Sequence, residues 1–493
     1  MLPGGGAAVT LSHNPPEFGH ALFPLPETLH MTPRLNRRQM LAASAAALGY
    51  LHLSPAASLA RVFRANEKLR VAGVGVGGKG SSDIDQAGNL MEVVALCDVD
   101  DGKMAPKAKK WPQAKTFTDY RKLFDDSALL KNIDAVTVSM PDHNHAQTSI
   151  LAMRAGKHVY CQKPLTHDVY EAHLMRAEAK KNKVCTQMGN QGTAANGLRR
   201  AAELVRKGEL GDVAEVHVWT NRPIWPQAPQ VTDKNPPKAA PAPAGVDWEA
   251  FLGPAPAREY AAGIHPFAWR GFWDYGTGAI GDMACHTANM AFMGLMLGHP
   301  TRVSAEAGDV NPMTCPSYAH VTIQFPKREG MVPVTLHWYE GKKDGQKVLP
   351  PEGLVKKATE MSGKKLVDSG SILVGTKGIA YSPDDYGAQV FFSTGPKTNS
   401  GTKPESMPEN NKGDQGQKNE WVEAIKAGKP ELALSNFDYA GLLTAAFLLG
   451  NVAIRTGKPF DFDGEKCQAS LKEAAPLIRR QYRKGWDLIG YNG

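Results

Sequence analysis

A glycine-rich turn at residues 75–80 (GVGGKG) constrains the fold of this chain more than any other feature. The turn ends the apolar run 69–76, and five further apolar runs follow it, several of them separated by helix-period segments. Strands that alternate with helices form a parallel sheet that is covered on both faces. The predicted strands are 69–76, 93–97, 116–118, 133–140, 158–161 and 184–188, and the predicted helices are 120–130, 145–155 and 169–180.

The spacing of the glycines gives this turn a chemical meaning. Gly75 allows a tight turn, and Gly77, one residue beyond Val76, lets the backbone approach a pyrophosphate. Gly80 permits close packing of the following helix on the strand. The free N–H groups at the start of that helix attract an anion. We therefore predict a Rossmann domain that binds a dinucleotide.

Asp98 indicates which dinucleotide binds. It ends the second predicted strand, at about the 20-residue spacing expected for the acid that contacts the ribose. A carboxylate there accepts hydrogen bonds from ribose hydroxyls and repels a 2′-phosphate. No Arg immediately follows Asp98, so NAD(H) is the predicted cofactor.

After residue 190 the pattern becomes that of an α+β domain with an open, mostly antiparallel sheet. Residues 192–207 have helical periodicity, and 213–220 alternate apolar and polar residues like a half-exposed strand. Further predicted strands are 302–309, 319–325, 332–339, 372–374 and 390–393, and further predicted helices are 420–427, 438–456 and 472–484.

Two long segments of this second half have the composition of loops. Residues 226–245 are rich in Pro and Ala, and residues 394–417 are polar with Gly, Pro, Asn and Ser. Neither is predicted to enter the core, and at least one is expected near the substrate. The predicted domains are the Rossmann domain at 66–190 and a substrate and oligomerisation domain at 191–493.

The first 60 residues have the pattern of an export signal. Within residues 31–60, the pair Arg37-Arg38 precedes an apolar stretch and a small-residue exit at 58–60 (SLA). This pattern resembles a twin-arginine signal peptide, and the apolar stretch is shorter than the roughly 20 residues that span a bilayer. Residues 1–30 are rich in Gly and Pro and lie upstream of Met31, the start that we favour. We expect a periplasmic or otherwise exported protein with no membrane span after processing.

Composition argues against two kinds of partner. The formal net charge of +8 comes from basic residues spread along the chain, without the aromatic-interleaved basic stretch of a nucleic-acid site. The six cysteines form no Cys-x-x-Cys pair and no zinc-finger spacing. We therefore predict neither nucleic-acid binding nor a metal site, and buried free thiols for the cysteines.

Several motifs, in this order, resemble those of the Gfo/Idh/MocA oxidoreductases. The resemblance covers residues 69–460 and implies a Rossmann domain, an open-faced α/β domain and an active site between them. It also implies oxidation or reduction of hydroxyls on sugars and cyclitols. The motifs are 141–145 (PDHNH), 160–165 (YCQKPL), Trp269-Arg270, 274–278 (DYGTG) and the pair Asp282 and His286.

The resemblance implies roles for three of these residues. Lys163 would stand beside the nicotinamide and the substrate, and His286 would be the acid/base. Asp282 would contact the substrate or orient His286. One position departs from the family: Gln162 stands where the family has Glu, so Lys163 lacks its usual neighbouring carboxylate.

The chemistry of alcohol oxidation is consistent with these roles. A base must remove the hydroxyl proton, and a cation must stabilise the developing alkoxide. Lys163 follows the fifth predicted strand, at the carboxyl edge where such sheets bind ligands. If a helix starts near residue 278, Asp282 and His286 lie one turn apart on one face. The helix N-terminus would lower the pKa of His286 and Asp282 would raise it, so the direction stays open.

Further residues are predicted to contact the two ligands. The expected partner is a small-molecule carbohydrate, and the family's exposed sheet implies a homo-oligomer. Predicted cofactor contacts besides the glycine turn and Asp98 are Pro141, His145, Gln162 and Lys163, and predicted substrate contacts are Arg270, Trp273, Tyr275, Asn190 and His265.

Three functions remain open at the level of the sequence. The first is an NAD-dependent oxidoreductase acting on a hydroxyl of a sugar, cyclitol or glycoside. The second is a glycoside hydrolase or lyase whose tightly bound NAD is transiently reduced. The third, suggested by Gln162, is a sugar-binding protein without catalysis.

Overall fold

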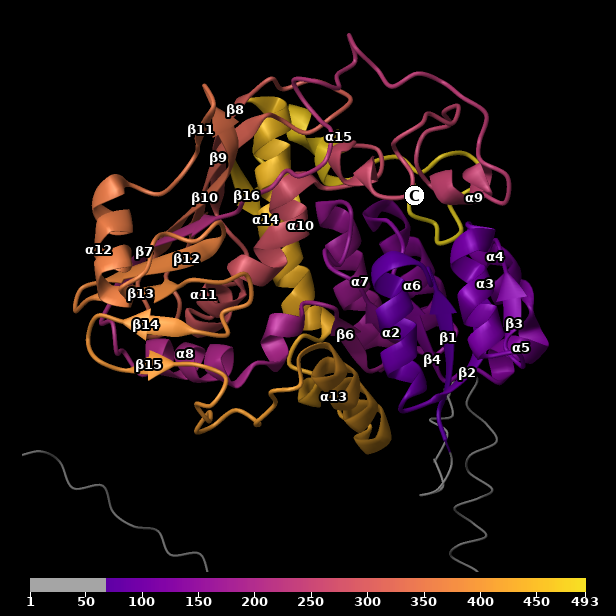
Figure 1. Cartoon of the computed structure of the whole chain (residues 1–493), viewed down its shortest axis with the longest axis horizontal. Coiled ribbons are helices and arrows are strands. Elements are labelled where there is room, and N and C mark those ends of the chain that lie inside the picture. Colours follow the sequence, from indigo (N-terminus) through magenta and orange to yellow (C-terminus); the bar gives the residue numbers. More distant parts are fainter. Residues whose placement is uncertain (1–67) are drawn as a thin grey trace, which may run out of the picture. The chain divides into compact units, whose positions relative to one another are not determined.

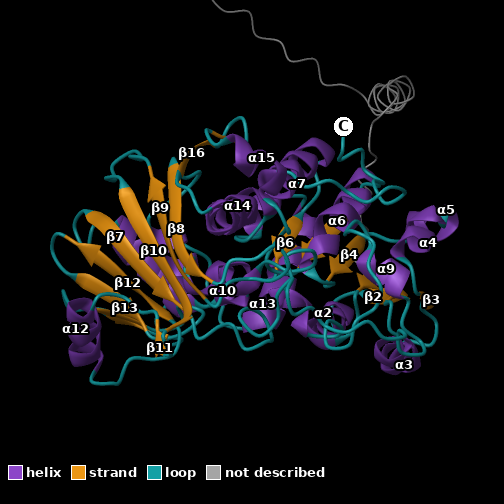
Figure 2. Cartoon of the chain, turned by 90° about the horizontal axis from the view of Figure 1, so that it is seen from above, coloured by secondary structure: helices purple, strands orange, loops and turns teal. Residues whose placement is uncertain are grey.

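The computed structural model describes residues 68–493; residues 1–30 and the predicted signal peptide at 31–60 lie outside the described residues. The described chain builds two sheets (Figures 1 and 2). The first sheet is parallel, with the order β3-β2-β1-β4-β5-β6, which confirms the predicted Rossmann fold. Its strands are β1 (Arg70–Val74), β2 (Glu92–Cys97), β3 (Lys115–Phe117), β4 (Ala135–Val138), β5 (His158–Cys161) and β6 (Thr186–Met188).

Aspartates start several of the helices that connect these strands. Asp168 begins α7 in a reciprocal capping box with Glu171, and Asp126 caps α5. The predicted single helix at 120–130 is therefore wrong, because the chain breaks at Asp126 into two helices. The helical segments are α2 (Gly78–Gly88), α3 (Asp101–Lys110), α4 (Tyr120–Asp125), α5 (Ser127–Lys131), η2 (Asp142–Asn144), α6 (His145–Arg154) and α7 (Val169–Asn182).

The second sheet is mixed and mostly antiparallel, as predicted. Its order is β15-β14-β13-β12-β7-β10-β9-β8-β16-β17, with β11 paired to β10, and β7 is parallel to β10. The strands are β7 (Val213–Trp219), β8 (Arg302–Gly308), β9 (Tyr318–Phe325), β10 (Val334–Lys343), β11 (Gln346–Lys347), β12 (Gly370–Gly375), β13 (Ile379–Ser382), β14 (Val390–Phe392), β15 (Lys397–Thr398), β16 (Phe460–Asp463) and β17 (Gln468–Ala469).

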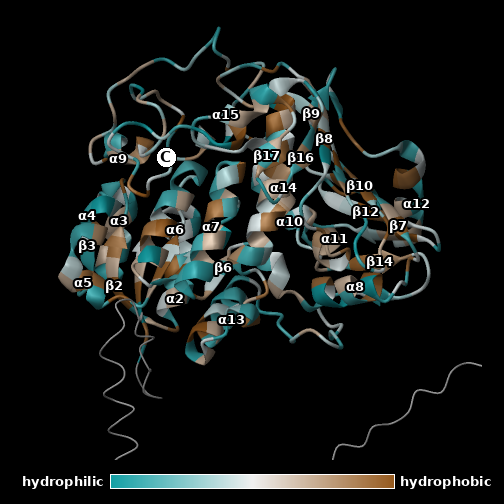
Figure 3. Ribbon diagram, turned by 180° about the vertical axis from the view of Figure 1, so that it is seen from behind, coloured by the Kyte–Doolittle hydropathy of each residue, from teal (hydrophilic) through white to brown (hydrophobic). Residues whose placement is uncertain are grey.

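One long helix, α14 (Phe437–Thr456), joins the two halves because it packs against both α7 and strands β8 and β9. It is apolar and long enough to cross a bilayer, but 83% of its most apolar window is buried within the fold. Figure 3 shows its hydrophobic residues among those of the neighbouring elements. The other helical segments of this half are η3 (Gln191–Ala194), α8 (Asn196–Arg206), α9 (Trp248–Leu252), η4 (Ala268–Gly271), α10 (Gly278–Thr287), α11 (Asn289–Gly294), α12 (Glu352–Ser362), α13 (Gly413–Ala427), η5 (Pro430–Leu432), η6 (Lys472–Ala474) and α15 (Ala475–Ile478).

Two segments near the end of the chain, helix α13 and the residues after α15, pack against the Rossmann half. Helix α13 starts inside the predicted loop 394–417, which corrects that prediction, and its Trp421 packs in one cluster with Leu69 of the Rossmann core. The helix predicted at 472–484 is present only over residues 472–478, as η6 and α15. Regular helix ends at Ile478, and the extended chain beyond it lets Arg480 and Tyr482 reach Glu171 on α7, each at 2.7 Å.

The Pro- and Ala-rich segment 226–245 crosses to the carboxyl end of β2. The Asp101 N–H donates to the Gly245 carbonyl, and the Asp247 N–H donates to the Val99 carbonyl, both at 2.8 Å. A segment of the second half therefore covers the edge of the Rossmann sheet where ligands bind.

The glycine turn generates a stability prediction. A Cβ on Gly80 would lie 1.9 Å from the carbonyl oxygen of Gly75, whereas a Cβ on Gly78 would meet nothing within 4 Å. Gly80→Ala should lower the free energy of unfolding by about 1–3 kcal/mol or more, because α2 must move off β1. Gly78→Ala, strained only by its positive φ of 51°, should cost about 1 kcal/mol. Urea unfolding of both variants checks the order, and equal losses would contradict it.

Candidate active site

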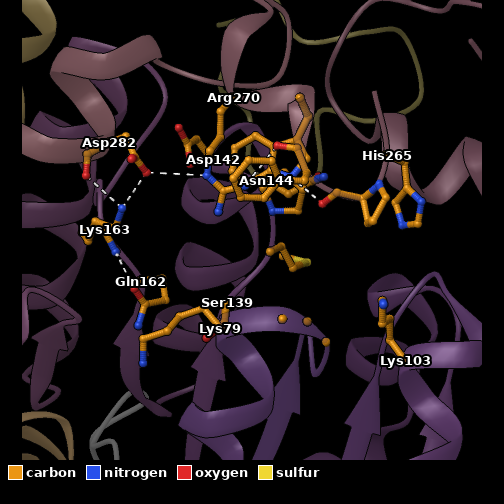
Figure 4. A pocket seen from close by; sticks show the side chains of 18 of the residues that line it. Lys79, Lys103, Ser139, Asp142, Asn144, Gln162, Lys163, His265, Arg270 and Asp282 are labelled. Atoms are coloured by element: carbon orange, nitrogen blue, oxygen red, sulfur yellow. Dashed lines mark hydrogen bonds and ion pairs between the residues drawn. The ribbon is translucent and has the colours of Figure 1, made fainter. Parts of the chain in front are cut away.

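A cavity of about 600 Å³ runs from the glycine turn to helix α10, between the two halves (Figure 4). Its Rossmann side is formed by the turn and by the residues that follow β2, β4 and β5. The second half closes it with residues after β7, with the segment 265–270 and with α10. Lining residues include Gly75, Gly77, Lys79, Asp98, Lys103, Met140, Pro141, Asp142, Gln162, Lys163, Arg222, His265, Arg270, Asp282 and His286.

The glycine end of the cavity fits a dinucleotide. Helix α2 begins after Gly77 with no side-chain cap and no acid in its first turn, so its N–H groups face the cavity edge without a competing side chain. The Asp98 carboxylate accepts from the N–H groups of Val76 at 2.7 Å and Gly77 at 2.9 Å. Asp98 therefore holds the turn in shape as well as lining the cavity. Gly80 does not line it and serves the close packing of α2.

An ion pair joins the two halves at the other end. The Lys163 Nζ, following β5, lies 2.7 Å from Asp282 Oδ1 and donates to the Asp282 carbonyl at 2.8 Å. Arg270 Nε is 3.5 Å from Asp282 Oδ1, and Arg222 Nε is 3.8 Å from Oδ2. Burial raises the pKa of Asp282, but the charges of Lys163 and Arg270 outweigh burial and bring it below its ordinary value.

His286 lies one helical turn after Asp282 on α10 and lines the same cavity. The Asp282 carboxylate binds Lys163, and the imidazole packs edge-on against Tyr386 with ring centroids 5.1 Å apart. Its Nδ1 has no hydrogen-bond partner among residues 68–493. Burial and the charge of Lys163 together lower the pKa of His286 to about 3, although Asp282 acts in the opposite direction. The imidazole is therefore neutral at neutral pH.

Asp142 is a buried acid in this cavity that the sequence predictions passed over. It is 4% exposed and accepts a 2.7 Å hydrogen bond from Thr277 Oγ1, at the start of α10. Burial raises its pKa to about 7, against the effects of Thr277, Arg270 and Lys163. Its place in the motif 141–145, beside the predicted contact Pro141, was the available signal.

Two of the predicted cofactor contacts, Gln162 and His145, differ in their position relative to the cavity. Gln162 lines the cavity, but His145 is 1% exposed and lies between two loops. Its Nδ1 is 2.8 Å from the Pro164 carbonyl oxygen and its Nε2 is 2.7 Å from that of Met140. Both nitrogens can donate only in the imidazolium form. Burial lowers the pKa of His145, but Cys161 and the two carbonyls outweigh it and raise the pKa.

Three predicted substrate contacts are absent from the described lining of this cavity. Trp273 donates to the Asn311 carbonyl at 3.1 Å. Tyr275 is fully buried and packs against Phe251. Asn190 is also fully buried and donates to the Cys285 carbonyl at 3.2 Å. These three side chains are therefore packed within the fold, and their contact with substrate stays a prediction.

The other two predicted substrate contacts, Arg270 and His265, line the cavity at different ends. Arg270 lies beside Asp282, whereas His265 Nε2 lies 3.5 Å from Asp100 Oδ2, near the carboxyl end of β2 (Figure 4). His265 is thus on the side of the cavity where the adenosine of a dinucleotide would lie.

Some lining residues gave no usable sequence signal. Lys79 lies within the glycine turn and Lys103 on α3, and both are ordinary surface lysines by composition. Arg222 follows β7, and Tyr386 comes from an irregular loop after β13. Only the tertiary fold brings these side chains to one cavity.

Comparison with known families covers both halves. The family model described as "Oxidoreductase family, NAD-binding Rossmann fold" matches residues 69–190. The companion model, "Oxidoreductase family, C-terminal alpha/beta domain", matches residues 198–353. Together the two matches span more than half of the 493 residues.

Individual relatives match less of the sequence. Inositol 2-dehydrogenase of Salmonella typhimurium is 29% identical over 154 residues, which are 30% of this chain and 45% of that protein. The match thus spans less than half of that relative's length. Myo-inositol 2-dehydrogenase of Thermotoga maritima is 24% identical over 32% of this chain and 47% of its own.

Among solved structures, an inositol dehydrogenase homologue from Azotobacter vinelandii with NADH and myo-inositol superposes with a TM-score of 0.54. It is 16% identical and covers 80% of this chain and 98% of that chain. Aldose-aldose oxidoreductase from Caulobacter crescentus, complexed with glycerol, also gives 0.54 at 16% identity, over 80% and 100%. At such identities the likeness concerns the fold. With both halves matched by its models, the chain belongs to the Gfo/Idh/MocA oxidoreductase family, whose Rossmann domain binds NAD.

Proposed function

We propose that this protein is an NAD(H)-dependent oxidoreductase that acts on a hydroxyl of a sugar, a cyclitol or a glycoside. One observation carries the proposal: a single cavity joins the glycine turn to the cluster of Lys163, Asp282 and His286. The ligands in the solved structure from Azotobacter vinelandii, NADH and myo-inositol, support a cyclic polyol as the substrate class.

The side chains at the α10 end divide the chemistry between them. Bound NAD⁺ would supply the hydride acceptor. His286, kept neutral by burial, accepts the hydroxyl proton, and the ionised Asp282 favours the imidazolium that forms. Lys163 Nζ, held by Asp282, stabilises the developing negative charge on the substrate oxygen.

Removing either group should abolish turnover. We expect Lys163→Ala and His286→Ala each to lower kcat by at least about 100-fold, the usual contribution of a positioned acid, base or cation. The exposed Lys180→Ala, at the end of α7, is the matched control. NADH absorbance with a panel of cyclitols, aldoses and glycosides measures the rates. Full activity in both site variants would refute the assignment.

The same panel separates the oxidoreductase from its alternatives. Net NADH formation supports the proposal, whereas release of free sugar without net NADH identifies the hydrolase or lyase with retained NAD. Denaturing the purified protein and measuring released NAD(H) shows whether the cofactor is carried with it. A protein that binds no NAD(H) and turns over nothing would leave only the sugar-binding function.

The raised pKa of Asp142 makes stability depend on pH. The folded state keeps the proton up to about pH 7, while the unfolded chain loses it near 4. Wild-type stability from this group is therefore present below about pH 4 and is lost as pH rises towards 7. Asp142→Asn should gain stability relative to wild type across that window and stay level above it. Urea unfolding at several pH values measures the difference, and a pH-independent difference would contradict the assignment.

We further propose export through the twin-arginine route and a homo-oligomer in solution. The pair Arg37-Arg38 before an apolar stretch supports export. Replacing both with Lys should retain the protein in the cytoplasm, as cell fractionation would show, and normal export would count against the signal.

The open second sheet supports assembly, and light scattering of the purified protein would give the number of copies.

A further inference from the structure

We infer that Gln162 and Asp83 form a charge-swapped pair, in which the acid of the family's Glu-Lys-Pro motif has moved from the loop after β5 to helix α2. Through this pair, Asp83 is a positioning residue for Lys163. The inference deepens the proposed function and rests on it only for the effect on turnover.

The amide of Gln162 connects the two elements. Its Nε2 donates to Asp83 Oδ2 at 2.8 Å, and its Oε1 accepts from the Lys163 N–H at 3.3 Å. Gln162 is 5% exposed. Because the side chain bonds the backbone of the next residue, fixing Gln162 also fixes the peptide from which Lys163 reaches Asp282.

Asp83 is fully buried and has a donor on every side. Its Oδ1 accepts from Lys79 Nζ at 2.8 Å and Lys418 Nζ at 2.6 Å. Its Oδ2 accepts from Gln162 and, at 2.9 Å, from Ser139 Oγ. Burial raises the pKa of Asp83, but Lys418 and Lys79 outweigh burial and lower it. This carboxylate is therefore ionised.

The charges around Asp83 balance. Lys79 also contacts Asp414 at 2.8 Å, so two lysines face two carboxylates. Lys418, on α13, is fully buried, with Nζ 3.9 Å from the ring centroid of Tyr160. A neutral amide at position 162 completes this cluster, because it can donate to Asp83 without adding charge.

A glutamate at position 162 would break the balance. It would place an acceptor 2.8 Å from the Asp83 oxygen where a donor now stands, and two carboxylates at that distance do not both stay ionised. The chain can therefore carry the acid at position 83 or at position 162, but not at both. Gln162 is the required partner of Asp83 and not a sign of lost catalysis.

The test is a charge-swap cycle in the full chain, read first by urea unfolding and by NADH fluorescence titration. We expect Gln162→Glu to weaken NADH binding and lower kcat about 10-fold, with KM changed less, because Lys163 is displaced. Asp83→Asn should also be impaired, since it leaves Lys418 buried without its carboxylate. The double variant keeps one acid and one amide in the cluster, although the acid no longer contacts Lys418 directly. It should therefore lose less free energy of unfolding than the two single losses added together, and it should bind NADH more tightly than either single variant.

A pH profile distinguishes this pair from ordinary packing. In Gln162→Glu, protonation of the new carboxylate restores a donor towards Asp83, so the loss of stability and of NADH binding should shrink as pH falls. The other charged groups of this cluster are Lys79, Lys418 and Asp414. Gln147→Glu is the matched control, because Gln147 is also buried but donates to Tyr120 and not to Asp83. Asp83→Asn should therefore not rescue it.

Two results would overturn the inference. The first is a double variant whose loss of unfolding free energy equals or exceeds the two single losses added together. The second is a Gln162→Glu protein with wild-type stability and NADH binding. The unfolding and NADH-binding readouts need no substrate. If no sugar is oxidised by the wild type, the proposed function fails while the swap cycle still decides the pair.

Discussion

The ion pair between Lys163 and Asp282 is the interaction on which the site depends. It joins the loop after β5 to helix α10, so it forms only when both sheets are in place. The two side chains are 16% and 13% exposed, and at 2.7 Å their attraction is little screened by solvent. Loss of either partner would leave a poorly solvated charge in the cavity. The pair therefore sets the distance between cofactor side and substrate side as well as the charge near the reacting atoms.

Burial, more than the local helix, decides the state of the groups around that pair. From the sequence, the helix N-terminus is expected to lower the pKa of His286 and Asp282 is expected to raise it. In the structure the largest effect on the pKa of His286 is desolvation, which brings it to about 3. The same burial raises the pKa of Asp142 to about 7. One cavity thus holds a neutral base and an acid that titrates near neutral pH, and neither state can be read from neighbouring residues in the chain.

The parts that could be predicted from sequence are those encoded locally. Apolar periodicity found all six strands of the parallel sheet, and the glycine spacing found the turn that β1 leads into. Sequence patterns could not predict which aromatic and polar side chains line the cavity and which pack in the core. Tyr275 stands in a motif that resembles a substrate site, and Trp273 lies just before that motif, yet both side chains are buried. The helix predicted at 472–484 ends early, at Ile478, and the residues beyond it contact Glu171, about 300 residues earlier in the sequence.

Helix α13 shows why the cofactor half cannot be treated as the first 120 or so described residues alone. Its Trp421 completes the apolar cluster that includes Leu69 and Val93, and its Lys418 neutralises Asp83. A fragment that ended at residue 190 would expose that cluster and would leave Asp83 with Lys79 as its only ionic partner among these residues. Asp83 accepts a hydrogen bond from Gln162, and Gln162 accepts one from the backbone of Lys163. Helix α13 therefore affects the position of Lys163 through its contact with Asp83. The cofactor half of the site therefore depends on residues from the last quarter of the sequence, where none of the sequence motifs lies.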